Sequence, residues 1–348
     1  MLKPFSQMAF AVIISSVTAA MSLGAIDTGG TLYYTTFAGG ANLHKVDYSW
    51  TAGVLSFSNN TNIGTGVAGA DGILFLPNGN LAVGGQGRRV HEVDLLGNLI
   101  TTLSVPTDSY HLSLSPGGKV LYSSSIPGTP TAITLNGSGG LVGATAAVLP
   151  VSGTQSVLDT IAWAPNGTTL YTSSFSGGNG VVGKLAIAGG PESPTSATTS
   201  APVALAASHG MAYDPFSDSF ITMGDNAISR FSSTGVLLET ITFAVGTDFD
   251  QGTVDGLGHI FAANNGGDLF LIDYSATGTL SAASTIFDRR FLANALDDLA
   301  PKVGPGSIDS IPEPVSMGIW CVLAGIAVFG GLSRRRRSLL PLFARPSA

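Results

Sequence analysis

The sequence predicts an all-β protein made of repeated sheet units, and three observations carry that prediction. Five stretches share one pattern: a short apolar strand, a turn of Pro, Asn, Gly or Asp, and a second strand rich in β-branched and aromatic residues. They are spaced 39, 49, 50 and 41 residues apart. No intervening segment shows a 3.6-residue apolar period, so helices should be scarce. A period of roughly 40–50 residues is typical of the four-stranded blades of a β-propeller. The stretches start at Asp71, Tyr110, Asp159, His209 and Asp250.

Two incomplete repeats stand at opposite ends of this array. The stretch "GGTLYYTTF" from Gly29 matches the second strand of the repeat, but no first strand precedes it. The stretch "LDDLA" from Leu296 matches "LDTIA" from Leu158, yet no blade follows it. We therefore expect residues 296–300 to pair with residues 32–37 and to complete one blade from both ends of the domain. Such closure removes the exposed sheet edges that otherwise promote aggregation.

One composite blade and five intact ones give a six-bladed β-propeller over residues 28–301, followed by a linker at 302–311. Seven blades stay open as an alternative at this point. The stretches "SGGLVGATAAVLPVSG" and "GGPESPTSATTSAPVALAA" are loose enough to contain additional strands.

The repeat turns carry a resemblance to known propellers. "SPGGKVLYSSS" and "APNGTTLYTSS" resemble the YVTN and NHL-type repeats, and residues 28–301 as a whole resemble the six-bladed superfamily that includes SMP-30-type lactonases. These motifs indicate the fold far better than an activity. The resemblance implies a metal-dependent enzyme only as one option, because the Glu and Asn ligands usual in that superfamily have no matching positions here.

Composition restricts the partners and the chemistry. Residues 25–311 hold 21 carboxylates against 9 Lys and Arg, a net charge of −12, and this field repels nucleic acid. The single cysteine, Cys321, lies in the apolar segment near the end of the chain, so the repeat domain has no disulfide and no thiolate nucleophile. At the other end, residues 1–25 combine Lys3, a short apolar run and small residues, which predicts a secretory signal peptide.

The end of the chain has three parts. Pro312, Glu313 and Pro314 form an extended tripeptide because each proline fixes φ. Residues 315–332 contain no charge and are near the lower length limit for a transmembrane helix. A block of arginines then marks the cytoplasmic side, and a tail at 338–348 follows. The block consists of Arg334, Arg335, Arg336 and Arg337.

This order of tripeptide, short helix and arginine block, residues 312–337, resembles the PEP-CTERM sorting signal, also catalogued as the ice-binding protein C-terminal domain. The resemblance implies an exosortase partner in a Gram-negative bacterium and export alongside exopolysaccharide. It also implies a precursor anchored in the inner membrane that later reaches the cell surface or the extracellular matrix. The ice-binding label belongs to this tail and is no evidence that the protein binds ice.

One position recurs at the start of every predicted first strand, and first strands line the axis of a propeller. We therefore expect these side chains to form a ring near one mouth of a central channel, with Tyr110 and the neighbouring His111 beside the acids. Ca²⁺ suits such an oxygen-rich ring, and an imidazole lets another divalent cation compete. The alternative is a structural role, in which each aspartate caps a turn or bonds the next blade. The candidate metal ligands are Asp71, Asp159, His209, Asp250 and Asp297.

Two classes of function follow. The first is an exported, non-enzymatic binding or matrix protein that associates with exopolysaccharide. The second is a lactonase or lyase-type enzyme that uses a cation at the channel mouth. No nucleophile elbow or Ser-His-Asp arrangement can be identified, and no catalytic residue is assigned. The sequence requires no cofactor beyond the candidate Ca²⁺ or other divalent cation, and the non-enzymatic class is favoured.

Overall fold

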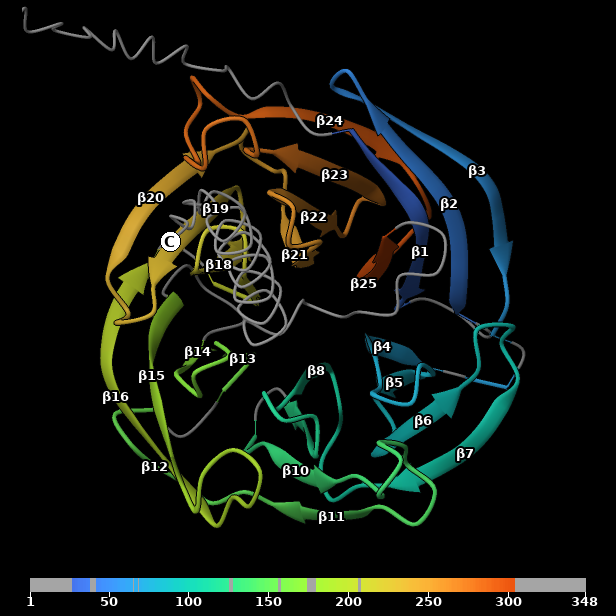
Figure 1. Cartoon of the computed structure of the whole chain (residues 1–348), viewed down its shortest axis with the longest axis vertical. Helices are drawn as coiled ribbons and strands as arrows, with labels where there is room; N and C mark the ends of the chain where they lie inside the picture. Colours follow the sequence, from blue (N-terminus) through green and yellow to red (C-terminus); the bar gives the residue numbers. More distant parts are fainter. Residues whose placement is uncertain are drawn as a thin grey trace, which may run out of the picture.

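The computed structural model describes residues 27–37, 42–64, 66–67, 69–124, 128–155, 158–173, 180–205 and 208–303. These residues form six β-sheets arranged around a central axis, as a six-bladed β-propeller (Figure 1). The described residues contain no helix, and hence none that is long and apolar enough to cross a membrane. The predicted signal peptide at 1–25, sorting signal at 312–337 and tail at 338–348 lie outside the described residues.

Blade 1 combines both ends of the described chain, and the other blades are each continuous in sequence. From the axis outward, blade 1 contains β25 (Leu296–Val303), β1 (Thr28–Thr36), β2 (Leu43–Thr51) and β3 (Val54–Asn62). Blade 2 contains β4 (Ala70–Phe75), β5 (Leu81–Gly85), β6 (Arg89–Val93) and β7 (Leu99–Ser104). Blade 3 contains β8 (His111–Leu114), β9 (Val120–Ser124), β10 (Thr131–Thr134) and β11 (Thr145–Val148).

Blade 4 has five strands. These are β13 (Ile161–Trp163), β14 (Thr169–Ser173), β15 (Gly180–Ala188), β16 (Ser196–Leu205) and, outermost, β12 (Val151–Gly153). Blade 5 contains β17 (Gly210–Asp214), β18 (Ser219–Gly224), β19 (Ala227–Ser232) and β20 (Leu237–Thr242). Blade 6 contains β21 (Phe249–Val254), β22 (His259–Asn264), β23 (Asp268–Asp273) and β24 (Ile286–Phe291).

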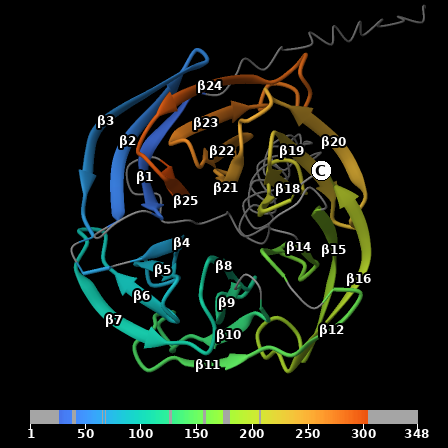
Figure 2. The ribbon, with the colours of Figure 1, turned by 180° about the vertical axis from the view of Figure 1, so that it is seen from behind.

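The predicted composite blade is confirmed. Strand β25 pairs antiparallel with β1, with Tyr33 opposite Ala300 and Tyr34 opposite Leu299. Because Thr31 also pairs with Lys302, the strand continues to Val303, two residues into the segment predicted as linker 302–311. Both face-on views place β25 beside β1, between blades 6 and 2 (Figures 1 and 2). The innermost strands contact their neighbours in an unbroken circle, β25, β4, β8, β13, β17, β21 and back to β25.

The seven-bladed alternative is wrong. The first loose stretch supplies β11, the outer strand of blade 3, and then β12. The second supplies β16, and β12 pairs parallel with it, Val151 opposite Ala197. The extra strand therefore widens blade 4 and adds no new blade.

The core lies between neighbouring blades, at the level of the second strands. Strands β5, β9, β14, β18 and β22 are buried at every position, because each is covered on both faces by an adjacent sheet. This explains their β-branched and aromatic composition. The outer strands face solvent and keep exposed residues such as Leu99, Leu238 and Phe287.

Carboxylates reinforce several joins between blades. Glu92 of β6 accepts a hydrogen bond from the backbone of Leu141 in blade 3, at 2.6 Å. Glu192 of blade 4 accepts hydrogen bonds from Ser115 and from the backbone of Gly117, both at 2.7 Å, in blade 3. Asp273 of blade 6 accepts a 3.0 Å hydrogen bond from the Trp50 indole of blade 1. Glu92 and Glu192, two of the four glutamates in the chain, therefore connect blade 3 to its two neighbours.

Candidate functional site at the propeller axis

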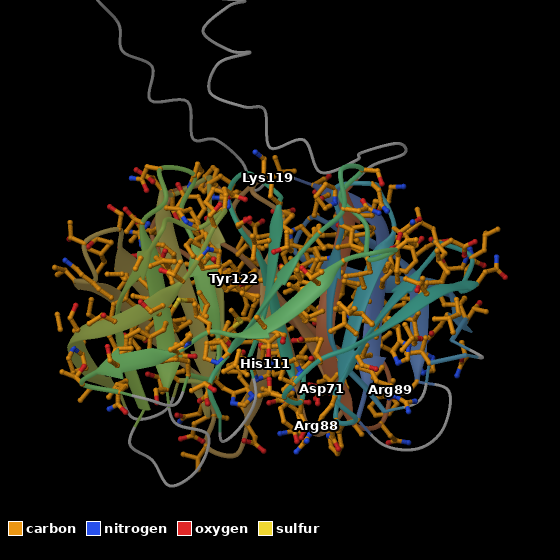
Figure 3. The ribbon with its side chains drawn as sticks, turned by 90° about the horizontal axis from the view of Figure 1, so that it is seen from below. Asp71, Arg88, Arg89, His111, Lys119 and Tyr122 are labelled. Atoms are coloured by element: carbon orange, nitrogen blue, oxygen red, sulfur yellow. The ribbon has the colours of Figure 1, made fainter. Side chains whose placement is uncertain are left out.

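The six recurring positions do stand at the starts of the innermost strands. Asp71, Asp250 and Asp297 lie within β4, β21 and β25. Tyr110 and His209 directly precede β8 and β17, and Asp159 lies two residues before β13. Seen from the side, Asp71 and His111 lie toward one face of the disc, together with Arg88 and Arg89, and Lys119 lies at the opposite face (Figure 3). We call this cluster of polar side chains on the axis the axial cluster. It consists of Asp71, His111, His209, Asp250, Gln251, Asp297 and Asp298.

Three of the innermost strands carry the same irregularity where they enter the axial cluster. In blade 2 the pairing moves from Ala70–Gly85 to Ile73–Val83, so the inner strand has one residue more than its partner. The same two-against-three step occurs at Gly252 in blade 6 and opposite Thr36 in blade 1. A β-bulge of this kind changes the alternation of side chains, which allows consecutive residues to turn toward the same side. In this way β21 supplies both Asp250 and Gln251, and β25 supplies both Asp297 and Asp298.

Close approach of the strands near the axis requires glycine after two of the recurring positions. A Cβ on Gly72 would lie 2.6 Å from the carbonyl oxygen of Tyr110 in the next blade. A Cβ on Gly210 would lie 2.8 Å from the side-chain oxygen of Gln251 in blade 6. The Asp-Gly and His-Gly dipeptides of the repeat therefore combine a polar side chain with tight packing around the axis.

Side chains from opposite blades meet across the axis. The Gln251 amide nitrogen from blade 6 lies 2.8 Å from Nδ1 of His111 in blade 3, the blade directly opposite. The His111 ring makes an edge-to-face contact with His209 of blade 5, with 4.7 Å between ring centroids. His209 Nε2 in turn lies 3.0 Å from Asp250 Oδ1. These contacts fill the axis at this level with hydrogen-bonded side chains.

This filling corrects the predicted arrangement. The sequence led us to expect residues that face a water-filled channel near its mouth. Instead Asp71, Asp159 and Asp297 are at most 4% exposed, and His209 is 8% exposed. Of the six recurring positions, only Tyr110 and Asp250 are partly exposed. The physical reason is the radius of a six-bladed ring, which is small enough for long side chains such as His and Gln to reach across.

The carboxyl groups of the axial cluster are strongly perturbed. Burial raises the pKa of Asp71 to about 7, and the charge of Asp250 adds to this rise, against the opposing hydrogen bonds from Gln86 and Asp297. Burial, followed by the charges of Asp71 and Asp250, also raises the pKa of Asp297 and Asp298 well above the usual range. Hydrogen bonds link Asp71 to Asp297 and Asp297 to Asp250. A proton shared along such a chain lets several carboxyls stay close together without water.

The two histidines differ in charge. Burial lowers the pKa of His111 well below 6.5, and nearby His209 lowers it further, so His111 is neutral and accepts the hydrogen bond of Gln251. Burial also acts to lower the pKa of His209, but the hydrogen bond to Asp250 and the charges of Asp250, Asp159 and Asp71 outweigh it and raise this pKa. The cluster therefore favours the charged form of His209 and the neutral form of His111.

The backbone at the recurring positions joins neighbouring blades. The carbonyl oxygen of His209 accepts hydrogen bonds from the hydroxyls of Thr160 at 3.0 Å and Thr172 at 2.8 Å, both in blade 4. The carbonyl oxygens of Asp71 and Asp159 each accept a hydrogen bond from a hydroxyl of a neighbouring blade, Thr35 and Ser124 respectively. At three of the six positions it is therefore the backbone carbonyl that joins the blades, whereas the sequence led us to expect this role for the side chain.

The donor set of the axial cluster, carboxylate oxygens with one imidazole, is of the kind that suits Ca²⁺ or another divalent cation. The described residues nevertheless include no group of three or more His, Cys, Asp or Glu side chains placed to hold a metal ion. Metal binding stays a prediction for the five residues proposed from the sequence, which are Asp71, Asp159, His209, Asp250 and Asp297.

Three residues at or beside the axial cluster could not be identified from the sequence. In a regular strand the side chains alternate between the two faces, so the sequence predicts that Asp298 points away from Asp297. The same alternation predicts that Gln251 points away from Asp250. Gln86 lies on the turn after β5, and its amide is 3.4 Å from Asp71. The only signal for Asp298 and Gln251 in the sequence is a pair of consecutive polar residues at the start of an apolar strand.

Comparison with known proteins supports the fold and goes no further. No protein-family model matches the chain, and no curated protein matches its sequence. Among solved structures, a protein of unknown function from Bacteroides caccae shares 11% identity over 78% of this chain and 98% of that one, with a TM-score of 0.50. A streptogramin B lyase shares 15% identity over 67% of this chain and 72% of that one, with a TM-score of 0.45. A virginiamycin B lyase from Staphylococcus aureus shares 10% identity over 76% of this chain and 87% of that one, with a TM-score of 0.45. At these identities the likeness concerns the β-propeller fold alone.

Proposed function

We propose that this chain is an exported β-propeller that acts by binding, without catalysis, among exopolysaccharide at the cell surface or in the extracellular matrix. The observation that carries the non-catalytic part is the closed axis. Gln251 and His111 join opposite blades at 2.8 Å on the propeller axis, so their side chains occupy the channel that the enzymatic alternative requires. The residues around them are buried and bonded to one another, which suits a rigid scaffold.

The export part rests on residues outside the described structure. The tripeptide Pro312-Glu313-Pro314, the apolar segment at 315–332 and the arginines at 334–337 support an inner-membrane precursor that an exosortase processes. In this proposal the propeller is the cargo, and its outer surface makes the contacts with matrix components.

Cell fractionation tests the export part. We expect the tagged wild-type chain in the extracellular matrix fraction of an exosortase-containing Gram-negative host. A variant without residues 312–337 lacks both the membrane anchor and the processing signal. It should therefore not be cut by the exosortase and should be found only in the periplasm. A variant with the four arginines replaced by glutamine should accumulate as an unprocessed or misoriented precursor. Recovery of the wild-type chain from the cytoplasm alone would end this proposal.

The second candidate function is a metal-dependent lactonase or lyase-type activity, and one observation favours it. Several carboxyls with raised pKa values share a small volume at the axis, and a divalent cation can replace shared protons in such a group. Elemental analysis of the purified chain, compared with Asp159→Ala and Asp250→Ala, distinguishes the two functions. A stoichiometric cation that is lost in both variants would favour the enzyme over the binding protein.

A further inference from the structure

A cavity of about 450 Å³ opens between the outer parts of blades 5 and 6, away from the axial cluster. Its lining comes from β20 and the loop after it, from β23, and from β24 with the segment that leads into it. This volume falls within the range of sites that bind small molecules, roughly 300–1,000 Å³. None of the sequence motifs discussed above lies in this cavity, and neither proposed function uses it.

One wall of the cavity is aromatic. The Phe243 ring makes edge-to-face contacts with Phe287 at 5.1 Å and with Phe270 at 5.8 Å between centroids. Phe249 supports both Phe243 and Phe270 from behind, at 4.9 Å from each. Phe287 is 47% exposed, although it is a large apolar side chain on an outer strand. A rigid aromatic surface that stays open to solvent is typical of a binding site.

A guanidinium stands at the rim of this wall. The Arg289 side chain is 61% exposed, and its Cζ lies 5.9 Å from the centre of the Phe270 ring. Within the described residues, Arg289 forms one ion pair, and its Nη1 lies as far as 3.9 Å from Oδ2 of Asp268. An exposed pair at this distance contributes little to stability, so the guanidinium is free to turn toward a ligand. Arginine binds carboxylates through two parallel hydrogen bonds, which favours a planar anionic group.

The charge of the whole chain makes this cation distinctive. The net charge is −7, and most of the surface therefore repels anions. Arg289 places a positive charge over an aromatic wall, while Thr242, Thr247 and Thr285 add the few polar atoms of the lining. The combination matches a ligand with an apolar ring face and one carboxylate. The face stacks on the phenylalanines and the carboxylate pairs with the guanidinium.

We propose that this cavity, between Phe243, Phe270, Phe287 and Arg289, binds a ring that carries a carboxylate. Two sources share this chemistry, a hexuronate unit of an acidic polysaccharide and a small aromatic acid. The first deepens the proposed binding function and rests on it, whereas the second stands without it. In either case the specificity lies at the boundary of two blades and not at the propeller axis.

Isothermal titration of the full chain, purified in detergent, tests this site with four probes. A tetramer of galacturonic acid and phenylacetate represent the two sources. The fully methyl-esterified tetramer keeps the sugar rings without the charge, and cyclohexylmethanol is a neutral apolar control. We expect one of the two acids to bind at least tenfold more tightly than both neutral compounds. Equal binding of an acid and its neutral counterpart, or no binding of either acid, would overturn the proposal.

Two pairs of variants locate the binding. Arg289→Gln removes the guanidinium of the cavity, whereas Arg290→Gln removes a neighbouring one that pairs with Asp288 at 2.9 Å and does not line the cavity. Phe287→Ser opens the aromatic wall, whereas Phe291→Ser changes a phenylalanine of the same strand that is 59% exposed outside the lining. We expect at least a tenfold loss of acid binding in the first member of each pair and less than a twofold change in the second. Equal effects within both pairs would contradict the assignment.

The outcome separates this inference from the function it deepens. If the full chain co-purifies with matrix polysaccharide and Arg289→Gln retains that association, the cavity assignment fails while the binding function stands. If phenylacetate binds in the cavity and the uronate tetramer does not, the site is confirmed for a small acid and the link to polysaccharide fails.

Discussion

Asp71, Asp297 and Asp298 bring three carboxyl groups into a nearly dry region around the axis. Isolated buried charges are costly, and proteins avoid that cost by keeping such groups protonated or by pairing them. Here both occur, since Asp71 and Asp297 are linked by a hydrogen bond while His209 pairs with Asp250 at 3.0 Å. The axial cluster thus holds protons that the unfolded chain releases, and its stability depends on pH.

The sign of that dependence follows from the direction of the pKa changes. A carboxyl whose pKa is raised on folding binds more protons in the folded state, so its stabilising effect is lost as the pH rises through the folded-state value. Asp71 has a pKa of about 7 in the folded state against 3.8 in the unfolded chain, so its effect is lost between about pH 4 and 7. The effect of His209, whose pKa is raised above 6.5, is lost above pH 6.5. His111, with its lowered pKa, acts in the opposite direction, because it destabilises the fold as the pH falls below 6.5.

We therefore predict that the melting temperature falls as the pH rises from about 5 to 7, because the raised pKa values of Asp71, Asp297 and Asp298 outweigh the opposite effect of His111. Each proton held only by the folded state contributes a slope of about 1.4 kcal/mol per pH unit. Asp298→Asn should reduce the fall, because it removes one carboxyl group that binds its proton more tightly in the folded state than in the unfolded chain. Differential scanning calorimetry at several pH values measures this. Asp248→Asn is the control, because this exposed residue has a φ of 50°, which asparagine also tolerates. An identical fall in both variants would contradict the prediction.

Gly252 lies in the bulge of β21 and has no room for a side chain. A Cβ there would meet Met223 Sδ at 2.1 Å and the carbonyl oxygen of Phe261 at 2.5 Å. We predict that Gly252→Ala lowers the free energy of unfolding by about 1–3 kcal/mol, as overpacking does in other cores. Gly266→Ala is the control, because its nearest neighbour would be 3.4 Å away. Urea unfolding monitored by circular dichroism measures the free energy of unfolding of both variants. Equal losses in the two would contradict the prediction, because the bulge would then accommodate the added methyl group.

At the scale of strands, the parts of the fold that are local in sequence could be predicted. The repeated pattern of strand, turn and strand predicts where the second strand of each blade lies, because burial on both faces selects apolar and aromatic residues such as Leu170 and Tyr171. The composite blade could be predicted as well, because "LDDLA" copies the opening of an intact repeat. Its pairing with β1 then followed from the need to close the ring.

The parts that depend on distant contacts could not be predicted. The bulges near Asp71, Asp250 and Asp297 arise from pairing with second strands and from crowding between blades, so periodicity alone places Gln251 and Asp298 on the wrong side. The contact of Gln251 with His111 depends on the radius of the ring. The fifth strand β12 is only three residues long and forms because blade 4 offers the edge of β16.

The join between blades 6 and 1 depends on one indole. Trp50 of β2 is fully buried, and its N–H donates to the buried Asp273 at the end of β23. Ser275 donates two hydrogen bonds to Oδ1 of Asp273, whereas the indole donates to Oδ2, which also has a longer 3.8 Å contact with His259 Nε2. Removal of the indole therefore weakens the stabilisation of this buried charge. This contact lies next to the composite blade, where the ring has to be closed.

We predict that Trp50→Phe lowers the free energy of unfolding by about 2–4 kcal/mol, from the smaller side chain and from the lost bond to a buried charge. Trp163→Phe is the matched control, since its indole donates only a 3.3 Å hydrogen bond to the Ser113 hydroxyl. Chemical unfolding of both variants provides the comparison. A loss for Trp163→Phe as large as that for Trp50→Phe would mean that volume alone determines the effect.

For the whole molecule, the composite blade provides backbone closure. Blade 1 takes β25 from one end of the propeller and β1 from the other, so the ring cannot open without breaking the ladder between them. Among the described residues, the other joins between blades consist of side-chain packing and individual hydrogen bonds, with an isolated backbone bridge between Asp225 and Phe249 in blades 5 and 6. A circular permutant can separate these two kinds of closure, because Gly30 pairs with Val303 and a short linker can connect the two strands as a hairpin.

We predict that a permutant of residues 28–303, joined in this way and reopened between β3 and β4, folds but unfolds at a lower urea concentration than the unpermuted domain. All six blades are then continuous in sequence, and only side chains hold the ring closed. A second permutant with the same linker, reopened at the exposed turn between Gly137 and Ser138, splits blade 3 and so restores a composite blade. It should unfold near the unpermuted domain, in one cooperative transition. If both permutants lose the same stability, the linker is responsible, and the composite blade contributes no closure of its own.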